Sequence, residues 1–180
     1  AKDRLIGSGM WNKPRSTFRA SDGQGDPFYV YVFGAHVAEV EVNTRTGKVD
    51  IKRFTAVHDV GKAINPLQVE GQIRGGVSMG IGFALMEEIT NRDGYINHLN
   101  FDRYLIPTSQ DLPLIEPVIV EEHNPLGPYG AKGVGEPPAI PVAAAIANAV
   151  YDAVGVRCRD LPIIPERILK ELTKNVENLS

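Results

Sequence analysis

Residues 123–138, HNPLGPYGAKGVGEPP, constrain the fold more than any other part of the sequence. This segment holds four prolines and four glycines. Proline fixes φ and lacks a backbone donor, and glycine has no preferred conformation, so no helix or strand spans such a run. We expect a long, shaped loop between a strand-rich part of the chain and a helical part. Long loops inside compact domains are usually functional.

Strands are expected before this loop. Apolar residues alternate with small or polar ones over residues 29–42, a turn follows, and a β-rich pattern continues over 49–60. These segments predict a β-hairpin in which Gly47 adopts the positive φ that the turn requires. Residues 118–122 are predicted as a further strand, and 95–104 as a short extended piece.

Residues 67–89 are predicted to form a glycine-rich helix. Their apolar side chains recur at every fourth position: Val69, Ile73, Val77, Ile81, Leu85 and Ile89. Each glycine inside a helix costs about 1 kcal/mol relative to alanine, so close contacts must compensate. We assign Gly76 and Gly80 to packing of this helix on the sheet. Gly71 instead suits a ligand that lies against the helix start, where backbone N–H groups are free.

Two more helices are expected after the loop. Residues 139–154 are small, apolar and alanine-rich and end at Gly155, and residues 165–175 begin with proline, as helices often do. The polar residues 1–28 are interpreted as a connector from an upstream segment, which leaves 29–180 as the domain. The expected fold is α+β: a mixed sheet with a β-hairpin, on which the glycine-rich and alanine-rich helices pack.

Composition limits the classes of function. The chain has 180 residues, of which 43% are hydrophobic, which suffices for one domain with a core. A net charge of −3 without a basic run disfavours nucleic acid or an anionic membrane as partner. No apolar run approaches the ~18 residues of a membrane span, and the first residues lack a signal peptide's apolar core, so a cytoplasmic location is expected. The single cysteine, Cys158, excludes an intramolecular disulfide and a cysteine-rich metal site from this chain alone.

Glu136 is the strongest candidate for chemistry among the carboxylates. Gly135 precedes it and two prolines follow, so the backbone is free on one side and fixed on the other. Such a segment can hold a carboxylate in an apolar surround, where desolvation raises the pKa and makes the group a usable base. The structural alternative is a glutamate at a helix N-terminus, stabilised by the helix dipole. The residues alone leave both interpretations open.

The other polar residues favour structural roles. Asp59 and Asn65, in HDVGKAINP, are predicted to be turn and cap residues. No serine-hydrolase or nucleotide-phosphate motif is present. The histidines lack the spacing of metal ligands, which argues against a metal site made by their side chains. They are His36, His58, His98 and His123.

Two segments, in order along the chain, resemble one known family. They are HDVGKAINPLQVEGQIRGGVSMGIGFALMEE at 58–88 and GPYGAKGVGEPPAIPVAAAIANAVYDAVG at 127–155. Both are similar to the C-terminal part of the molybdenum-binding large subunit of the xanthine dehydrogenase and aldehyde oxidase family. The similarity runs from about Gly34 to Leu169.

The resemblance implies roles for three residues. Glu136, in the VGEPP motif, would be the active-site base beside molybdenum. Gln72 would contact the molybdopterin cofactor or its metal-bound oxygen, and Gly135 would pack beside the metal site. The implied enzyme is a molybdenum hydroxylase, an oxidoreductase that hydroxylates an N-heterocycle or aldehyde with oxygen from water. Its cofactor would be molybdenum-molybdopterin in the cytosine dinucleotide form, with iron–sulfur clusters and FAD on partner subunits or domains.

Two hypotheses about function follow. The chain is either the catalytic C-terminal portion of such an enzyme or a non-catalytic scaffold and assembly module that is inactive by itself. The expected partners are the remainder of the molybdenum subunit, the iron–sulfur and FAD subunits and a small-molecule substrate, within an oligomer. Because the family's other cofactor-binding segments lie upstream, the chain is expected to be a fragment or a split subunit. The isolated chain is then expected to be inactive and to expose an apolar surface around 67–89 and 139–154.

Overall fold

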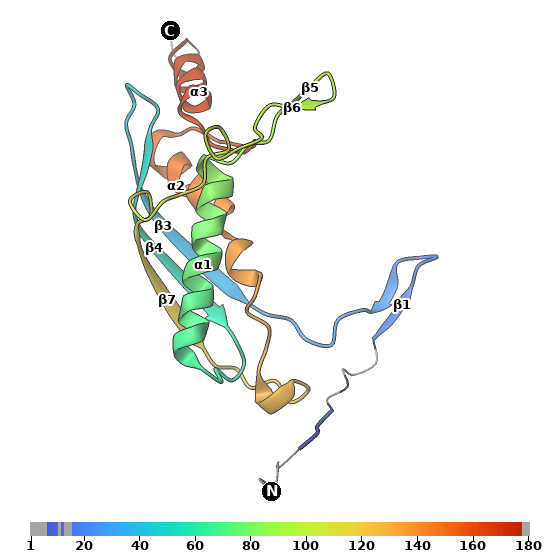
Figure 1. Ribbon diagram of the computed structural model, residues 1–180. Coiled ribbons are helices and arrows are strands. Elements are labelled where there is room, and N and C mark those ends of the chain that lie inside the picture. The colour runs from blue at the N-terminus through green and yellow to red at the C-terminus, as the bar shows by residue number, and fades with distance from the viewer. Residues whose placement is uncertain (1–6, 11, 13–15, 178–180) are drawn as a thin grey trace, which may run out of the picture.

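A three-stranded mixed sheet forms the centre of the molecule (Figure 1). The computed structural model describes residues 7–10, 12 and 16–177, with the side chains described as far as residue 174. Strands β3 (Gly34–Val42) and β4 (Val49–Asp59) pair antiparallel, and β7 (Leu114–Val120) pairs parallel with β4. The α+β class and the mixed sheet predicted from the sequence are confirmed, and the similar solved structures reported below share this fold.

The β3–β4 hairpin closes as its turn sequence predicts. Gly47 has φ +75°, and a Cβ at this position would lie 2.3 Å from the carbonyl oxygen of Pro165. The predicted strand at 29–42 begins late, because β3 starts only at Gly34. The predicted strand at 118–122 is displaced as well, since β7 already begins at Leu114 and includes Pro117. Proline is tolerated there because β7 is an edge strand of the sheet.

Helix α1 (Pro66–Leu85) lies across one face of the sheet (Figure 1). Asn65 caps it, because its side-chain oxygen accepts a hydrogen bond from the Gln68 N–H at 3.2 Å. The predicted four-residue spacing is confirmed: Ile73, Val77 and Ile81 are at most 1% exposed. The predicted end at Ile89 is wrong, because the helix stops at Leu85.

Helix α2 (Val142–Val154) packs beside α1 on the same face and buries Val142, Ile146 and Val150. Gly155 ends it in the left-handed conformation, as predicted. The start is later than the predicted residue 139, because the short 3-10 turn η2 (Pro137–Ala139) precedes it. The core joins both helices to β4 and β7 and includes Phe54, Ala56, Ile115, Ile163 and Ile168.

The last helix, α3 (Pro165–Glu177), extends two residues beyond the predicted 165–175. In Figure 1 it lies at the opposite end of the sheet from the 3-10 turn η1 (Pro128–Gly130). The loop 123–138 contains η1 and the first residues of η2, so it has no α-helix and no strand, as its composition predicts.

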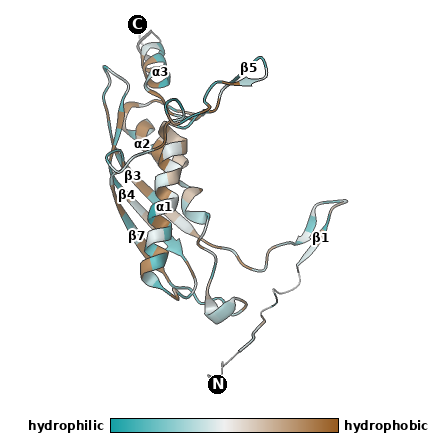
Figure 2. Cartoon of the chain, viewed as in Figure 1, coloured by the Kyte–Doolittle hydropathy of each residue, from teal (hydrophilic) through white to brown (hydrophobic). Residues whose placement is uncertain are grey.

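Two arms project from this body (Figure 1). One is the small hairpin β1 (Thr17–Arg19) and β2 (Gln24–Asp26), and the other contains β5 (Asn91–Arg92) and β6 (Tyr95–Ile96). The extended piece predicted over 95–104 is therefore limited to β6. Parts of the segments next to the arms are coloured as hydrophobic in Figure 2. Their exposed apolar side chains include Phe28, Phe33, Leu99 and Phe101.

None of the helices in the described residues combines the length and apolar character that crossing a bilayer requires. The division at residues 1–28 and 29–180 stays a prediction.

Candidate functional site

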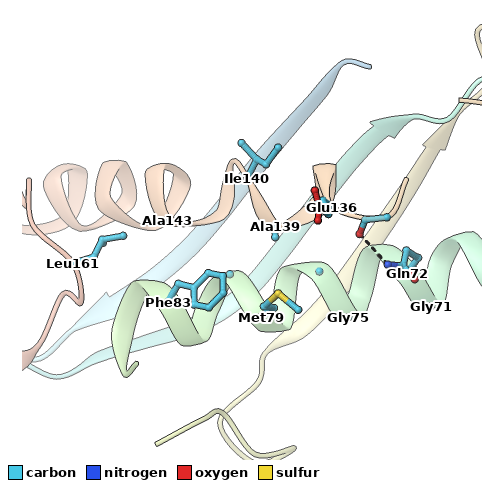
Figure 3. A pocket seen from close by; sticks show the side chains of 13 residues that line it. Gly71, Gln72, Gly75, Met79, Phe83, Glu136, Ala139, Ile140, Ala143 and Leu161 are labelled. Atoms are coloured by element: carbon cyan, nitrogen blue, oxygen red, sulfur yellow. Dashed lines mark hydrogen bonds between the residues drawn. The ribbon is translucent and has the colours of Figure 1, made fainter. Parts of the chain in front are cut away.

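A cavity of about 710 Å³ lies between α1 and the segment that leads from the loop 123–138 into α2 (Figure 3). One end is lined by glycines and polar residues, and the other end is apolar. The polar end contains Gly71, Gln72, Gly75, Gly135 and Glu136, and the apolar end contains Met79, Phe83, Ala139, Ile140, Ala143 and Leu161. The three residues assigned a role by resemblance therefore line one cavity, although they come from segments more than sixty residues apart.

A hydrogen bond joins the two sequence motifs directly. The Gln72 side-chain Nε2 donates to the Gly135 carbonyl oxygen at 2.9 Å (Figure 3). This bond fixes the loop against α1 at the residue before Glu136. It uses one amide N–H of Gln72 and leaves the amide oxygen available as an acceptor.

Glu136 lies at the polar end of the cavity and its side chain is exposed. No side-chain capping bond is made by Glu136, and α2 begins six residues later at Val142. Glu136 directly precedes η2, so it lies at the start of a 3-10 turn without forming a side-chain cap, and both interpretations of this residue stay predictions. Within residues 16–174, no hydrogen bond or ion pair engages the carboxylate. Apolar residues surround the Glu136 carboxylate on one side only, in contrast to the apolar surround expected from the sequence. Desolvation of this carboxylate would therefore require another part of the enzyme to cover the cavity.

The glycines of α1 divide into two groups, as the sequence predicts. A Cβ at Gly76 would lie 2.8 Å from Pro138 Cβ, and one at Gly80 would lie 2.5 Å from Val142 Cβ. Both therefore serve close packing, but their neighbours are η2 and α2 and not the sheet. Gly71 and Gly75 have nothing within 4 Å of the Cβ position and leave the backbone bare along the cavity.

The prediction that free backbone N–H groups lie at Gly71 is wrong. The helix begins at Pro66, and Asn65 already satisfies the N–H groups of Gln68 and Val69. Gly71 is the sixth residue of α1, so it lies beyond the first turn, where unpaired donors occur. What Gly71 offers the cavity is space and not hydrogen-bond donors.

A second cavity, of about 430 Å³, lies on the other side of the Gln72–Gly135 bond. Its polar lining includes Lys62, Asn65 and Lys132. The predicted structural roles of Asp59 and Asn65 are confirmed: Asn65 caps α1, and Asp59 accepts a hydrogen bond from the Gly61 N–H at 3.0 Å.

Asp59 and Lys132 form a buried ion pair that the sequence analysis missed. Their side chains are 8% and 9% exposed, and the Lys132 Nζ contacts Asp59 Oδ2. Burial alone raises the pKa of the Asp59 carboxyl, but the hydrogen bonds from Lys132 and the Gly61 N–H outweigh it and hold the pKa below its usual range. No local pattern links residues 73 positions apart, so nothing in the sequence indicates this pair.

A histidine pair lies between β3 and β4. The Nε2 atoms of His36 and His58 are 2.7 Å apart, so one ring donates a hydrogen bond to the other. Burial, and then the neighbouring His58, lower the pKa of His36 to about 4, and burial also lowers the pKa of His58. The regular register of the hairpin could have placed the two rings together, because His58 pairs opposite Gly34 and His36 pairs opposite Ala56.

Across the described residues, no group of three or more histidine, cysteine, aspartate or glutamate side chains is placed to hold a metal ion. A metal at the 710 Å³ cavity would therefore have to bring most of its ligands with it.

Comparisons with known proteins identify the family of the chain. The family model described as "Molybdopterin cofactor-binding domain" matches residues 1–113. The putative xanthine dehydrogenase molybdenum-binding subunit XdhA of Escherichia coli is 46% identical over 141 residues, which are 77% of this chain and 19% of that protein.

Solved structures show the same fold. Aldehyde oxidoreductase from Desulfovibrio gigas superposes with a TM-score of 0.81 at 38% identity over 88% of this chain and 17% of its own. Quinoline 2-oxidoreductase from Pseudomonas putida 86 gives a TM-score of 0.75 at 41% identity, over 78% of this chain and 18% of its own. The chain thus spans about a fifth of the length of the relatives it matches. It belongs to the molybdopterin cofactor-binding domain family of the molybdenum-binding subunits of xanthine dehydrogenases and aldehyde oxidoreductases.

Proposed function

We propose that this chain forms one wall of the active site of a molybdenum hydroxylase, with Glu136 as the base that takes a proton during hydroxylation of an N-heterocycle or an aldehyde. One observation carries the proposal. The Glu136 carboxylate, without a partner in the described part of the chain, lies at a cavity whose facing wall is the bare backbone at Gly71 and Gly75.

The residues present fit a molybdopterin cofactor. Gly71 and Gly75 leave room for a flat group to lie against α1, and a Cβ at either position would occupy that room. Gln72 lies between them and offers an amide oxygen for hydrogen bonding. Because no metal-ligating cluster is present in the described residues, this wall suits a metal held by ligands of the cofactor itself, such as the dithiolene sulfurs of molybdopterin.

The chain's own residues orient the cofactor and accept one proton. When bound, the molybdenum cofactor supplies the two-electron redox chemistry and the activation of water. Gln72 orients the cofactor and, through Gly135, holds the loop that carries Glu136. A carboxylate oxygen of Glu136 accepts the proton released as the water-derived oxygen attacks the substrate carbon, which is general-base catalysis. The apolar side chains around Met79 and Phe83 exclude water from the other end of the cavity.

The wider assembly is part of this proposal. The relatives are about five times longer than the matched region, so the remaining walls of the site would come from the rest of the molybdenum-binding subunit. We propose the cytosine dinucleotide form of the cofactor and electron transfer through iron–sulfur clusters and FAD on partner subunits or domains, on the basis of the family resemblance. A cytoplasmic location stays a prediction from the sequence.

Glu136→Gln in the complete enzyme tests the proposal. Gln has nearly the same shape but cannot take the proton, so turnover should fall by about 10²–10⁴-fold while molybdenum and pterin content stay at wild-type levels. Glu70→Gln is the matched control, because Glu70 is on α1 two residues from Gln72 and does not line the cavity. Normal turnover in fully loaded Glu136→Gln enzyme would reject the base and favour a non-catalytic scaffold.

A further inference from the structure

The loop that carries Glu136 has no regular structure of its own, so specific contacts must determine its position. Between Lys132 and Glu136 the sequence is Gly-Val-Gly, which has little conformational preference. Downstream, η2 is anchored where Pro138 packs against Gly76. A second anchor is needed upstream of Gly133, because a loop fixed at one end only would leave Glu136 free to move away from the cavity.

Backbone bonds attach the loop to the connection between β4 and α1. The Lys132 N–H donates to the Val60 carbonyl at 2.9 Å, and the Lys62 N–H donates to the Gly130 carbonyl at 2.8 Å. Gly61 lies between these bonds with φ +61°, and a Cβ there would lie 2.3 Å from the Gly130 oxygen. The two segments therefore run in close contact, in an arrangement that only glycine permits at residue 61.

The Asp59–Lys132 ion pair lies within this attachment and differs from the other ion pairs of the described residues. Its side chains are 8% and 9% exposed, whereas both members of every other pair are at least a third exposed. A buried pair adds little net stability, because desolvation of both charges offsets their attraction. Loss of one partner is strongly unfavourable, however, because the remaining charge is buried without compensation. Moving Lys132 away from Asp59 is therefore disfavoured.

We propose that Asp59 and Lys132 are positioning residues that hold Gly135 against Gln72 and so place the Glu136 carboxylate at the cavity. The pair lies at the upstream end of the Lys132–Glu136 segment and the Pro138–Gly76 contact lies at its downstream end. Glu136 is thus held between two fixed points. This inference rests on the proposed role of Glu136 as the base, but the position of the loop can be measured independently of that role.

The test uses the complete molybdenum-loaded enzyme and the variants Lys132→Met and Arg53→Met. Arg53→Met is the matched control, because Arg53 pairs with Glu116 across β4 and β7, 63 residues apart, on an exposed part of the sheet. Hydrogen–deuterium exchange followed by mass spectrometry reports the mobility of residues 126–138. We expect Lys132→Met to raise exchange in this peptide by about tenfold or more, and Arg53→Met to leave it unchanged.

Kinetics provide the second readout. Lys132→Met should lower kcat by about tenfold or more with a small change in KM, because a displaced base affects the chemical step more than substrate binding. Lys132→Arg retains the charge and should recover most of both properties. Asp59→Asn keeps an acceptor for the Gly61 N–H while removing the charge, so it gives the same test if Lys132→Met does not fold.

Unchanged exchange in 126–138, or a mobile loop with unchanged kcat, would overturn the inference. Failure of the proposed function gives a different result. The Glu136→Gln variant of the complete, molybdenum-loaded enzyme would then be active. The exchange measurement on Lys132→Met would still report whether the ion pair fixes the loop.

Discussion

Replacing Gly80 by alanine should destabilise the fold, although alanine is the better helix former. The gain in helix propensity is about 1 kcal/mol. A Cβ at this position would lie 2.5 Å from Val142 Cβ and 2.6 Å from Val142 Cγ2, well inside normal van der Waals contact. Val142 is fully buried and starts α2, so the overlap has to be relieved by moving one helix against the other. Such overpacking costs about 1–3 kcal/mol.

Gly75→Ala supplies the control in the same helix. It gains the same propensity, and nothing lies within 4 Å of its Cβ position, so it should stabilise the chain by up to about 1 kcal/mol. The propensity gain cancels when the two variants are compared, and Gly80→Ala should be less stable than Gly75→Ala by about 1–3 kcal/mol. Urea unfolding followed by circular dichroism measures this difference. Equal stability of the two variants would refute the close approach of α1 and α2.

Two further predictions concern the histidine pair and Gln72. The His36 pKa is lowered from 6.5 to about 4 in the folded state, so the unfolded state binds protons more readily between these values. Neutral His36 therefore contributes to the free energy of unfolding above pH 6.5. This contribution, about 2 kcal/mol for a partly exposed group, is lost as pH falls toward 4. Urea unfolding at several pH values should therefore show a weaker acid dependence in His36→Gln, and an identical dependence would count against a neutral pair. Gln72→Ala should lower cofactor occupancy or turnover more than thermal stability, as measured by molybdenum content, kcat and Tm; a lower Tm with normal cofactor content and rate would return Gln72 to a structural role.

Local signals in the sequence predicted most of the fold. The turn at Gly47 fixes the hairpin, and the four-residue spacing of Ile73, Val77 and Ile81 identifies the buried side of α1. The spacing continues to Ile89, but the helix does not. Distant residues lie against its last turn: the Ile163 N–H donates to the Ala84 carbonyl at 2.6 Å, and a Cβ at Gly82 would lie 2.9 Å from Pro107. Periodicity within a helix contains no information about such partners.

The sequence identified the residues of the candidate site better than it predicted their geometry. The motif resemblance named Gln72, Gly135 and Glu136, and the structure brings them to one cavity. The role expected for Gly71 was wrong in its physical reason, because Gly71 is the sixth residue of α1 and lies beyond the turn in which N–H groups are free. The Asp59–Lys132 pair depends on tertiary contacts, and nothing around either residue in the sequence indicates it.

Anomalous X-ray diffraction at the molybdenum absorption edge, from crystals of the loaded complete enzyme, locates the metal relative to Glu136. We expect a molybdenum peak in the cavity between α1 and the residues leading into α2, beside Gly75 and Glu136. A third cavity, of about 400 Å³ and lined by Arg157 and Lys170, lies elsewhere on the chain and provides a comparison. A peak at that cavity, or at any position away from Glu136, would contradict the account.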